Sequence, residues 1–391
     1  MEKFSGWNDE STGINPFVTH SKPVNRGWLA CAGQSVLACI LCLLRVPCLC
    51  ILAGILMITS ALSHVVGVSL ANGSVGGLHA GLASFPQTPF PWLERIVRFM
   101  FEVPAARVAM TMFGYYAPKE ATLPLVHTEL EPSPTLKARA SGGRGLPGIE
   151  VYIVNCQSYI DVLWLASRFA PTFARVSAAG GLRRVTTVEA LLMVTGCISQ
   201  VHFQEGMEAS TLQTLEWARS TLAGPLVLFA EGAPTNGKGV LRFCPSATDL
   251  ARALLRFPQD LAPHVRYLGI RYGAGDSPAS FVHGSVVWHA LQLMSRVVND
   301  MTITSLQPGL DPQPLDCMAA SGAGDAPQLS AVDSSEAHAA AAERWCALAQ
   351  TTLASLLRHG VGAVQLDASD HATFVRFAEG DASAHKKKKA L

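Results

Sequence analysis

The stretch Ile149–Asp161, which reads IEVYIVNCQSYID, decides the fold class. Its first six residues form a short, mostly apolar run, which is typical of a buried strand. Asn155, Ser158 and Asp161 follow this run directly, and such residues are typical of a turn that opens a helix. The stretch therefore predicts a strand that passes through a polar turn into a helix.

The same alternation continues toward the C-terminus. Apolar runs predict strands at 149–154, 172–177, 198–203, 225–230 and 265–272, and helical patterns lie at 160–169, 188–194 and 209–222. Strands that alternate with helices favour an α/β fold, with a mostly parallel sheet flanked by helices. In such a sheet the functional loops lie at the carboxyl ends of the strands.

A second strand end carries the Gly-rich sequence FAEGAPTNGKGVLRF over 229–243. Gly232 and Gly237 allow backbone N–H groups to approach an anion closely. Lys238 and Arg242 would add positive charge to the same turn. Because both polar turns follow buried strands, we expect them to meet in one cleft beside a membrane surface.

Composition excludes several classes of protein. Of 391 residues, 49% are hydrophobic and 15% are charged, with 30 Lys and Arg against 29 Asp and Glu. This balance argues against a nucleic-acid-binding protein with a broad basic face. The ten cysteines show neither the spacing of a metal site nor a disulfide framework, which favours a reducing, cytosolic environment and no metal. The mean hydropathy of +0.27 indicates that part of the chain lies in lipid.

Trp28–Leu70 is the predicted membrane segment, because it contains a single side chain of fixed charge, that of Arg45. The part after Arg45 is long enough to cross a bilayer. Arg45 and Pro47 mark a possible bend, so the sequence leaves open a single span or a hairpin. Trp92–Tyr116 mixes arginines with aromatic residues, which suits either an interfacial helix or a helix packed on the globular domain.

The tail contains Lys386–Lys389 and resembles a dilysine signal for the endoplasmic reticulum, which operates from the cytosol. We expect the catalytic domain and C-terminus to face the cytosol, on the endoplasmic reticulum membrane and on lipid droplets. The expected organisation is a polar leader (1–27), a membrane anchor with an interfacial helix (28–117), a linker (118–148), an α/β domain (149–309), a disordered insert (310–340) and a C-terminal helix with a Lys-rich tail (341–391).

The two turns resemble motif blocks of the glycerolipid acyltransferase family, which includes the lysophosphatidate acyltransferases. The first block, Asn-His-x-Ser-x-x-Asp, matches at Asn155, Ser158 and Asp161, with Cys156 in place of the histidine. The third block, which begins Phe-Pro-Glu-Gly-Thr, matches at Phe229, Glu231, Gly232, Thr235, Asn236 and Gly237, and departs at Ala233 and Pro234. Residues 1–19 are similar to the N-terminal block of the fungal lysophosphatidate:oleoyl-CoA acyltransferases, which are linked to lipid droplets and vacuolar sorting.

The resemblance implies a glycerol-phosphate acyltransferase-like fold and the acyl-CoA-dependent conversion of lysophosphatidic acid to phosphatidic acid at the cytosolic membrane face. It implies membrane lipid, lysophosphatidic acid and acyl-CoA as partners, with acyl-CoA as co-substrate and no further cofactor. Cys156 and Asp161 would occupy the catalytic positions. The substrate-binding positions would be Asn155, Ser158, Glu231, Gly232, Thr235, Asn236, Lys238 and Arg242.

Cys156 leaves three interpretations open. The family's histidine takes a proton from the acceptor hydroxyl, whereas a thiol of pKa ~8.5 is mostly protonated at pH 7. Cys156 could act as a thiolate base or as a transient acyl carrier. His202 or His264 could instead supply the base. Alternatively, the protein has lost acyl transfer and is a catalytically silent membrane adaptor that binds lipid or CoA in lipid-droplet or vacuolar sorting.

Overall fold

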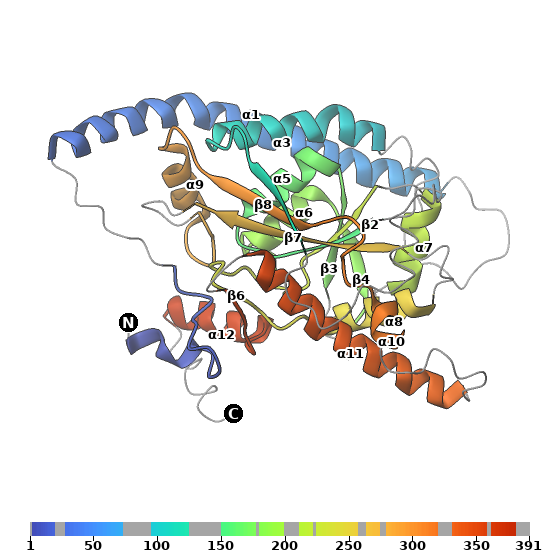
Figure 1. Cartoon of the computed structure of the whole chain (residues 1–391). Helices are drawn as coiled ribbons and strands as arrows, with labels where there is room; N and C mark the ends of the chain where they lie inside the picture. Colours follow the sequence, from blue (N-terminus) through green and yellow to red (C-terminus); the bar gives the residue numbers. More distant parts are fainter. Residues whose placement is uncertain are drawn as a thin grey trace.

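The computed structural model describes residues 2–19, 28–72, 95–124, 150–176, 180–198, 211–221, 224–256, 263–273, 279–319, 331–357 and 361–380. It has an α/β architecture, with helices on both faces of a central sheet (Figure 1). The predicted fold class is therefore confirmed at this level.

The central sheet has seven strands in the order β1-β8-β7-β2-β5-β3-β4. Their bounds are β1 Lys119–Leu123, β2 Glu150–Val154, β3 Thr172–Val176, β4 Leu182–Val185, β5 Leu226–Leu228, β7 His264–Tyr272 and β8 Met301–Leu306. Four neighbouring pairs are parallel, and the β7–β8 and β3–β4 pairs are antiparallel. A separate small sheet pairs β6 (Gly239–Val240) with β9 (Gly362–Ala363).

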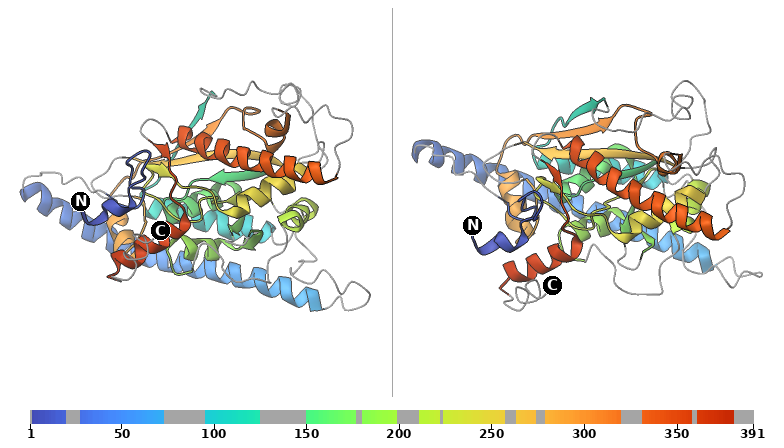
Figure 2. Two further views of the ribbon diagram at one scale, coloured as in Figure 1. Left: turned by 90° about the horizontal axis from the view of Figure 1, so that it is seen from below. Right: turned by 60° about the horizontal axis from the view of Figure 1, so that its bottom comes forward.

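Alternate residues of β2 enter two different cores, as the two-residue period of a strand requires. Tyr152 and Val154 join the core beneath α1 (Trp28–Asn72), η2 (Arg98–Glu102), α3 (Val103–Met112), α5 (Tyr159–Phe169), α6 (Thr187–Val194) and α9 (Val286–Met294). Val151 and Ile153 join the core beneath α7 (Thr211–Thr221), α8 (Pro245–Arg256), α10 (Pro314–Ala319) and α11 (Ala331–Leu356). The sheet thus separates an α1 side from an α11 side (Figure 2).

The N-terminal residues pack against the C-terminal helix α12 (Ala368–Ala378), and both lie at the same end of the molecule in all views (Figures 1 and 2). Trp7 and Phe17 are buried in a third apolar cluster with Phe374. Asp9 accepts a hydrogen bond from the N–H of Gln365, 2.8 Å away. Residues 2–19 of the expected polar leader therefore form part of the folded domain.

Two further boundary predictions need correction. The expected linker contains β1, which pairs in parallel with β8 at the sheet edge. The expected disordered insert contains α10 and the start of α11, and its Asp311 and Gln313 are buried against β7. The predicted strand at 198–203 and the Lys-rich tail lie outside the described residues.

The predicted membrane segment forms α1, a single continuous helix that passes through Pro47 without a break. Among the described residues, one helix, over Ser35–Ala61, is long and apolar enough to cross a membrane. The chain stays helical through Arg45 and Pro47, so the described part of the segment shows no hairpin there. The helix packs beside α3 on one face of the domain (Figure 1).

Candidate functional site

The two predicted strand ends meet at Cys156. The Cys156 N–H donates to the Glu231 carboxylate at 3.2 Å, and the Thr235 N–H donates to the Cys156 carbonyl at 2.8 Å. This contact follows from the sheet, because β2 and β5 are parallel neighbours whose carboxyl ends lie at the same edge. The predicted convergence of the two turns is therefore present in the structure.

Asp161 closes the first turn through a capping box at the start of α5. Its carboxylate accepts from the N–H groups of Gln157 and Ser158, at 2.7 and 2.8 Å, and from the Tyr272 hydroxyl. The Ser158 hydroxyl in turn accepts from the Ile160 N–H at 3.4 Å. Complete burial raises the pKa of Asp161 to about 7, although these hydrogen bonds favour the charged form and oppose the shift.

Glu231 performs the matching task for the second turn. One carboxylate oxygen accepts from Cys156, and the other accepts from the Leu241 N–H at 2.8 Å. Burial raises the pKa of Glu231 to about 8, and the charge of Asp161 adds to the shift. Glu231 therefore binds the backbone N–H of Cys156, Asp161 binds those of the next two residues, and burial raises the pKa of both carboxyl groups.

Asn155 continues the pairing of β2 with β7 beyond the last strand residue. Its side-chain amide donates to the Ile270 carbonyl at 3.0 Å and accepts from the Ile270 N–H at 2.7 Å, as a backbone group would. Gln157 donates to the same carbonyl at 2.6 Å. In the structure, the Asn155 side chain therefore aligns the turn with β7, and its predicted role in substrate binding stays a prediction.

The third-block turn is built differently from the expected anion site. The Asn236 side-chain amide donates to the carbonyls of Asn15 and Val18, each at 2.8 Å, so this group fastens the N-terminal segment. Lys238 and Arg242 have exposed side chains at the surface, while Asp161 and Glu231 are fully buried. The Asn236 amide is therefore engaged by the fold, and the two basic side chains are exposed, unlike the buried carboxyl groups.

Two glycines of this turn adopt the left-handed backbone conformation expected from the sequence. Gly232 has φ +67° and Gly237 has φ +75°. A Cβ atom at Gly237 would lie 2.5 Å from the Gln157 side-chain oxygen. These glycines thus permit a tight turn and the close approach of the two strand ends.

Burial is the main departure from the prediction. Of the predicted site residues, six are at most 1% exposed: Asn155, Cys156, Ser158, Asp161, Glu231 and Thr235. Gln157, between them, is 3% exposed, and its carbonyl accepts from the Phe281 N–H. The predicted open cleft is therefore wrong for the described conformation, in which these side chains are enclosed.

The histidine predictions have different outcomes. His264 begins β7 opposite Glu150, at the far end of the strands from Cys156, so it does not reach the site. His202 lies outside the described residues. Sequence reasoning missed His289, which comes from α9 and hydrogen-bonds through Nδ1 to the Tyr159 hydroxyl at 3.0 Å. No motif signals this residue, because it lies 130 positions beyond its partner.

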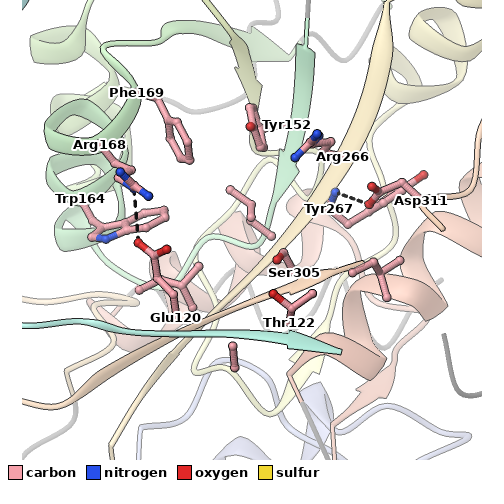
Figure 3. A pocket seen from close by; sticks show the side chains of 14 residues that line it. Glu120, Thr122, Tyr152, Trp164, Arg168, Phe169, Arg266, Tyr267, Ser305 and Asp311 are labelled. Carbon is pink, nitrogen blue, oxygen red and sulfur yellow. Dashed lines mark hydrogen bonds and ion pairs between the residues drawn. The ribbon is translucent and has the colours of Figure 1, made fainter. Parts of the chain in front are cut away.

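A cavity of about 160 Å³ lies elsewhere, at the amino ends of β2 and β7 (Figure 3). Its Arg168 pairs with Glu120 at 3.3 Å, and its Arg266 pairs with Glu150 at 3.2 Å. These arginines are already matched by carboxylates, so the cavity does not present a strong net charge to an anion. None of the predicted site residues lines it.

The described residues include no group of three or more His, Cys, Asp and Glu side chains that could hold a metal ion. No family model, curated protein or solved structure matches the chain. The functional argument therefore depends on the chemistry of the residues around Cys156: a thiol, two carboxyl groups with raised pKa values, and a His–Tyr pair whose tyrosine is the first residue of α5.

Proposed function

We propose that the protein is a membrane-bound, acyl-CoA-dependent acyltransferase that converts lysophosphatidic acid to phosphatidic acid. The observation that carries this proposal is the pair of hydrogen bonds that join both motif turns to the backbone of Cys156. The motif resemblance supports the substrate class. A location at the endoplasmic reticulum or lipid droplet, with the site toward the cytosol, belongs to the same proposal.

In this proposal Cys156 acts as the acyl carrier. Its sulfur attacks the acyl-CoA thioester, the C–S bond to CoA breaks, and the thiol proton ends on the CoA sulfur. The acceptor hydroxyl then attacks the acyl-cysteine, and its proton returns to Cys156. Asp161 and Glu231 are positioning residues, because their contacts are to the backbone of the turn rather than to the thiol.

The enclosed site requires an opening step before either substrate reaches Cys156. The third-block turn is covered by the N-terminal segment, which Asn236 holds through Asn15 and Val18. The Asn236 N–H also donates to the Pro16 carbonyl at 2.7 Å, and Trp7 and Phe17 of the same segment are buried with Phe374. To uncover the turn, the segment must therefore break these hydrogen bonds and expose part of this apolar cluster.

The experiment measures phosphatidic acid formed from radiolabelled acyl-CoA and lysophosphatidic acid by the purified full chain. We expect activity from the wild type and Cys156→Ser to lose it. Mass spectrometry after incubation with acyl-CoA alone should find an acyl group on Cys156. Full activity in Cys156→Ala would exclude the carrier role. A His289→Gln variant with unchanged melting tests whether the His–Tyr pair serves as the base.

The second candidate function is a catalytically silent membrane adaptor that binds lipid or CoA. The complete burial of Cys156 and Asp161 favours it, because Asp161 already acts as a helix-capping residue. Absence of product from the wild type, together with saturable binding of acyl-CoA, would establish this function in place of acyl transfer.

A further inference from the structure

Exposed apolar side chains gather on one side of the molecule. Among the described residues, the large and markedly exposed ones lie on α1, on elements that contact α1, or a few residues beyond the ends of those elements. They are Val36, Leu37, Ile40, Leu43, Leu44, Ile51, Met57, Ile58, Ile96, Phe99, Met100, Phe101, Val108, Tyr116, Leu192, Ile198, Val287, Trp288, Val297 and Val298. None belongs to α8, α10, α11 or α12 on the other sides of the domain.

α1 is fastened to the domain along most of its apolar length. Near its first third, Arg45 donates to the carbonyls of Met294 and Arg296, at 2.7 and 2.5 Å. Further along, Leu56 is buried in the core, and the Ser60 hydroxyl hydrogen-bonds Thr186 at 3.1 Å. From Arg45 to Ser60 the helix advances about 22 Å, which is most of a ~30 Å hydrocarbon layer.

This attachment is incompatible with a helix that crosses the bilayer. If α1 stood upright, the polar groups that bind it at both ends would lie inside the hydrocarbon, where unpaired polar groups are costly. A helix that lies flat exposes one long side to lipid and keeps the opposite side on the protein. The buried positions Leu52 and Leu56 and the exposed positions Ile51 and Met57 show this two-sided character.

The exposed side of α1 carries no ionised residue over Ser35–Ala61. Its one charged residue there, Arg45, is 6% exposed and points into the domain, toward the chain after α9. Water would solvate such a surface poorly, and a soluble protein partner would normally offer matching polar groups at its rim. A lipid leaflet is the occupant that this chemistry favours.

α9 extends the same surface. Leu291 contacts α1, since its carbonyl lies 3.8 Å from the Cys42 sulfur. Val287 and Trp288 precede Leu291 by four and three residues, so they lie on the same side of the helix. They are 69% and 62% exposed. An exposed tryptophan beside an apolar helix is typical of a membrane–water interface.

We propose that the chain binds one leaflet of a membrane in plane, through a face formed by α1, the η2–α3 segment and the start of α9, and that α1 does not span the bilayer. Trp288 then makes a second membrane contact, remote in sequence from the anchor. Arg95, whose guanidinium lies 5.7 Å from the centre of the Phe99 ring, is placed to reach lipid phosphates while Phe99 enters the apolar layer. This inference does not depend on acyl transfer.

The depth of α1 tests the orientation. Cys39 and Cys50 are both exposed, and Cys50 is eleven positions after Cys39, which places them on one side of the helix about 16 Å apart along it. Each is labelled in turn with a fluorophore, in full-length variants whose other exposed cysteines are serine. Spin-labelled phosphatidylcholine then reports the depth of each label in reconstituted vesicles.

In-plane binding predicts that the two labels lie at equal depth, within a few ångströms. A depth difference close to the full separation of about 16 Å would show a spanning helix and overturn the proposal. Labels that lipid does not quench at all, in a chain that elutes as a dimer without detergent, would show that a second copy covers the face instead.

The α9 contact is tested with the double variant Val287→Ser/Trp288→Ser. Its matched control is Glu343→Ser/Arg344→Ser, two exposed positions on α11 at the opposite side of the domain. We expect the first variant to remain bound to phosphatidylcholine vesicles through α1, but with roughly tenfold weaker partitioning in flotation, since each buried methylene contributes about 0.8 kcal/mol. The control should bind like wild type. Equal partitioning of both variants, with unchanged melting, would remove α9 from the membrane face.

Discussion

In the strand-end site, Asn155, Asp161 and Glu231 are polar and fully buried, whereas on α1 the side chains of Leu43 and Leu44 are apolar and 76% and 66% exposed. The buried polar groups have hydrogen-bond partners supplied by the chain itself. The two leucine side chains are instead left mostly uncovered by the described residues of the domain. The polar groups of the site are therefore satisfied within the fold, whereas the exposed apolar face of α1 is the surface that we propose to bind lipid.

This difference separates two kinds of consequence for substitutions. A change in the site should alter the stability of the domain, because each buried acceptor serves backbone N–H groups that have no access to water. A change on the exposed side of α1 should leave stability almost unchanged and alter membrane binding. Site variants that keep full stability, or α1-face variants that lose it, would contradict this difference between the two regions.

The largest effect is expected for Glu231→Ala. This change removes the acceptor of the Cys156 and Leu241 N–H groups and leaves both buried without a partner. We expect a loss of about 3–5 kcal/mol in the free energy of unfolding, measured by denaturation in mild detergent. Glu231→Gln keeps one carbonyl oxygen and should lose less. A Glu231→Ala variant as stable as wild type would show that the two turns are not held together by this carboxylate.

The next effect compares two adjacent residues of α1. Leu56 is 4% exposed and packs in the core, whereas Met57 is 59% exposed. Leu56→Ala should cost about 2–4 kcal/mol through lost burial and the cavity that remains. Met57→Ala should change unfolding by no more than about 0.5 kcal/mol. Equal effects of the two variants would mean that α1 is not packed on the domain as described.

The central strands were predictable because their signals are local. β2, β5 and β7 are apolar runs bounded by turn residues, and α5 carries its own cap in Ser158. β1 was not predictable in this way. Its sequence KEATL is largely exposed at the sheet edge, and its place in the sheet comes from pairing with β8, about 180 residues later.

The site was predictable only in part for a similar reason. Two turns that follow parallel strands must lie at one edge, so their convergence could be inferred from the order of the elements. Its enclosure could not be inferred, because the covering segment is held by contacts that are remote in sequence. Asn236 binds Asn15 and Val18, and Phe374 buries Trp7 and Phe17.

A smaller effect is expected from pH. Burial raises the pKa of Asp161 to about 7 and that of Glu231 to about 8, both far above their unfolded values near 4. Between these values the folded chain holds protons that the unfolded chain has released. This contribution to stability is complete below about pH 4 and is lost as pH rises through 7 and 8.

The thermal midpoint should therefore fall between pH 7 and 8.5, a range above both the lowered pKa of folded His371, about 4, and the pKa of an unfolded histidine near 6.5. The free energy of unfolding should fall by at most about 1.4 kcal/mol per pH unit for each group. Asp311, whose pKa burial also raises to about 7, adds to it. Glu231→Gln should reduce the slope near pH 8. An unchanged slope in that variant would show that Glu231 is ionised in the folded protein throughout this range.

The smallest effect concerns Ser158, whose role differs between the motif resemblance and the structure. As the N-cap of α5, its hydroxyl accepts from Ile160, so Ser158→Ala should cost about 1 kcal/mol and Ser158→Gly only a few tenths. If the residue acts only as a cap, initial rates of acyl transfer should follow this ranking, with Ser158→Gly close to wild type. If the hydroxyl contacts the acceptor lipid in the open state, both variants should show the same increase in KM for lysophosphatidic acid despite their different stabilities. The glycine variant is decisive, because it removes the hydroxyl while leaving the turn nearly as stable as before.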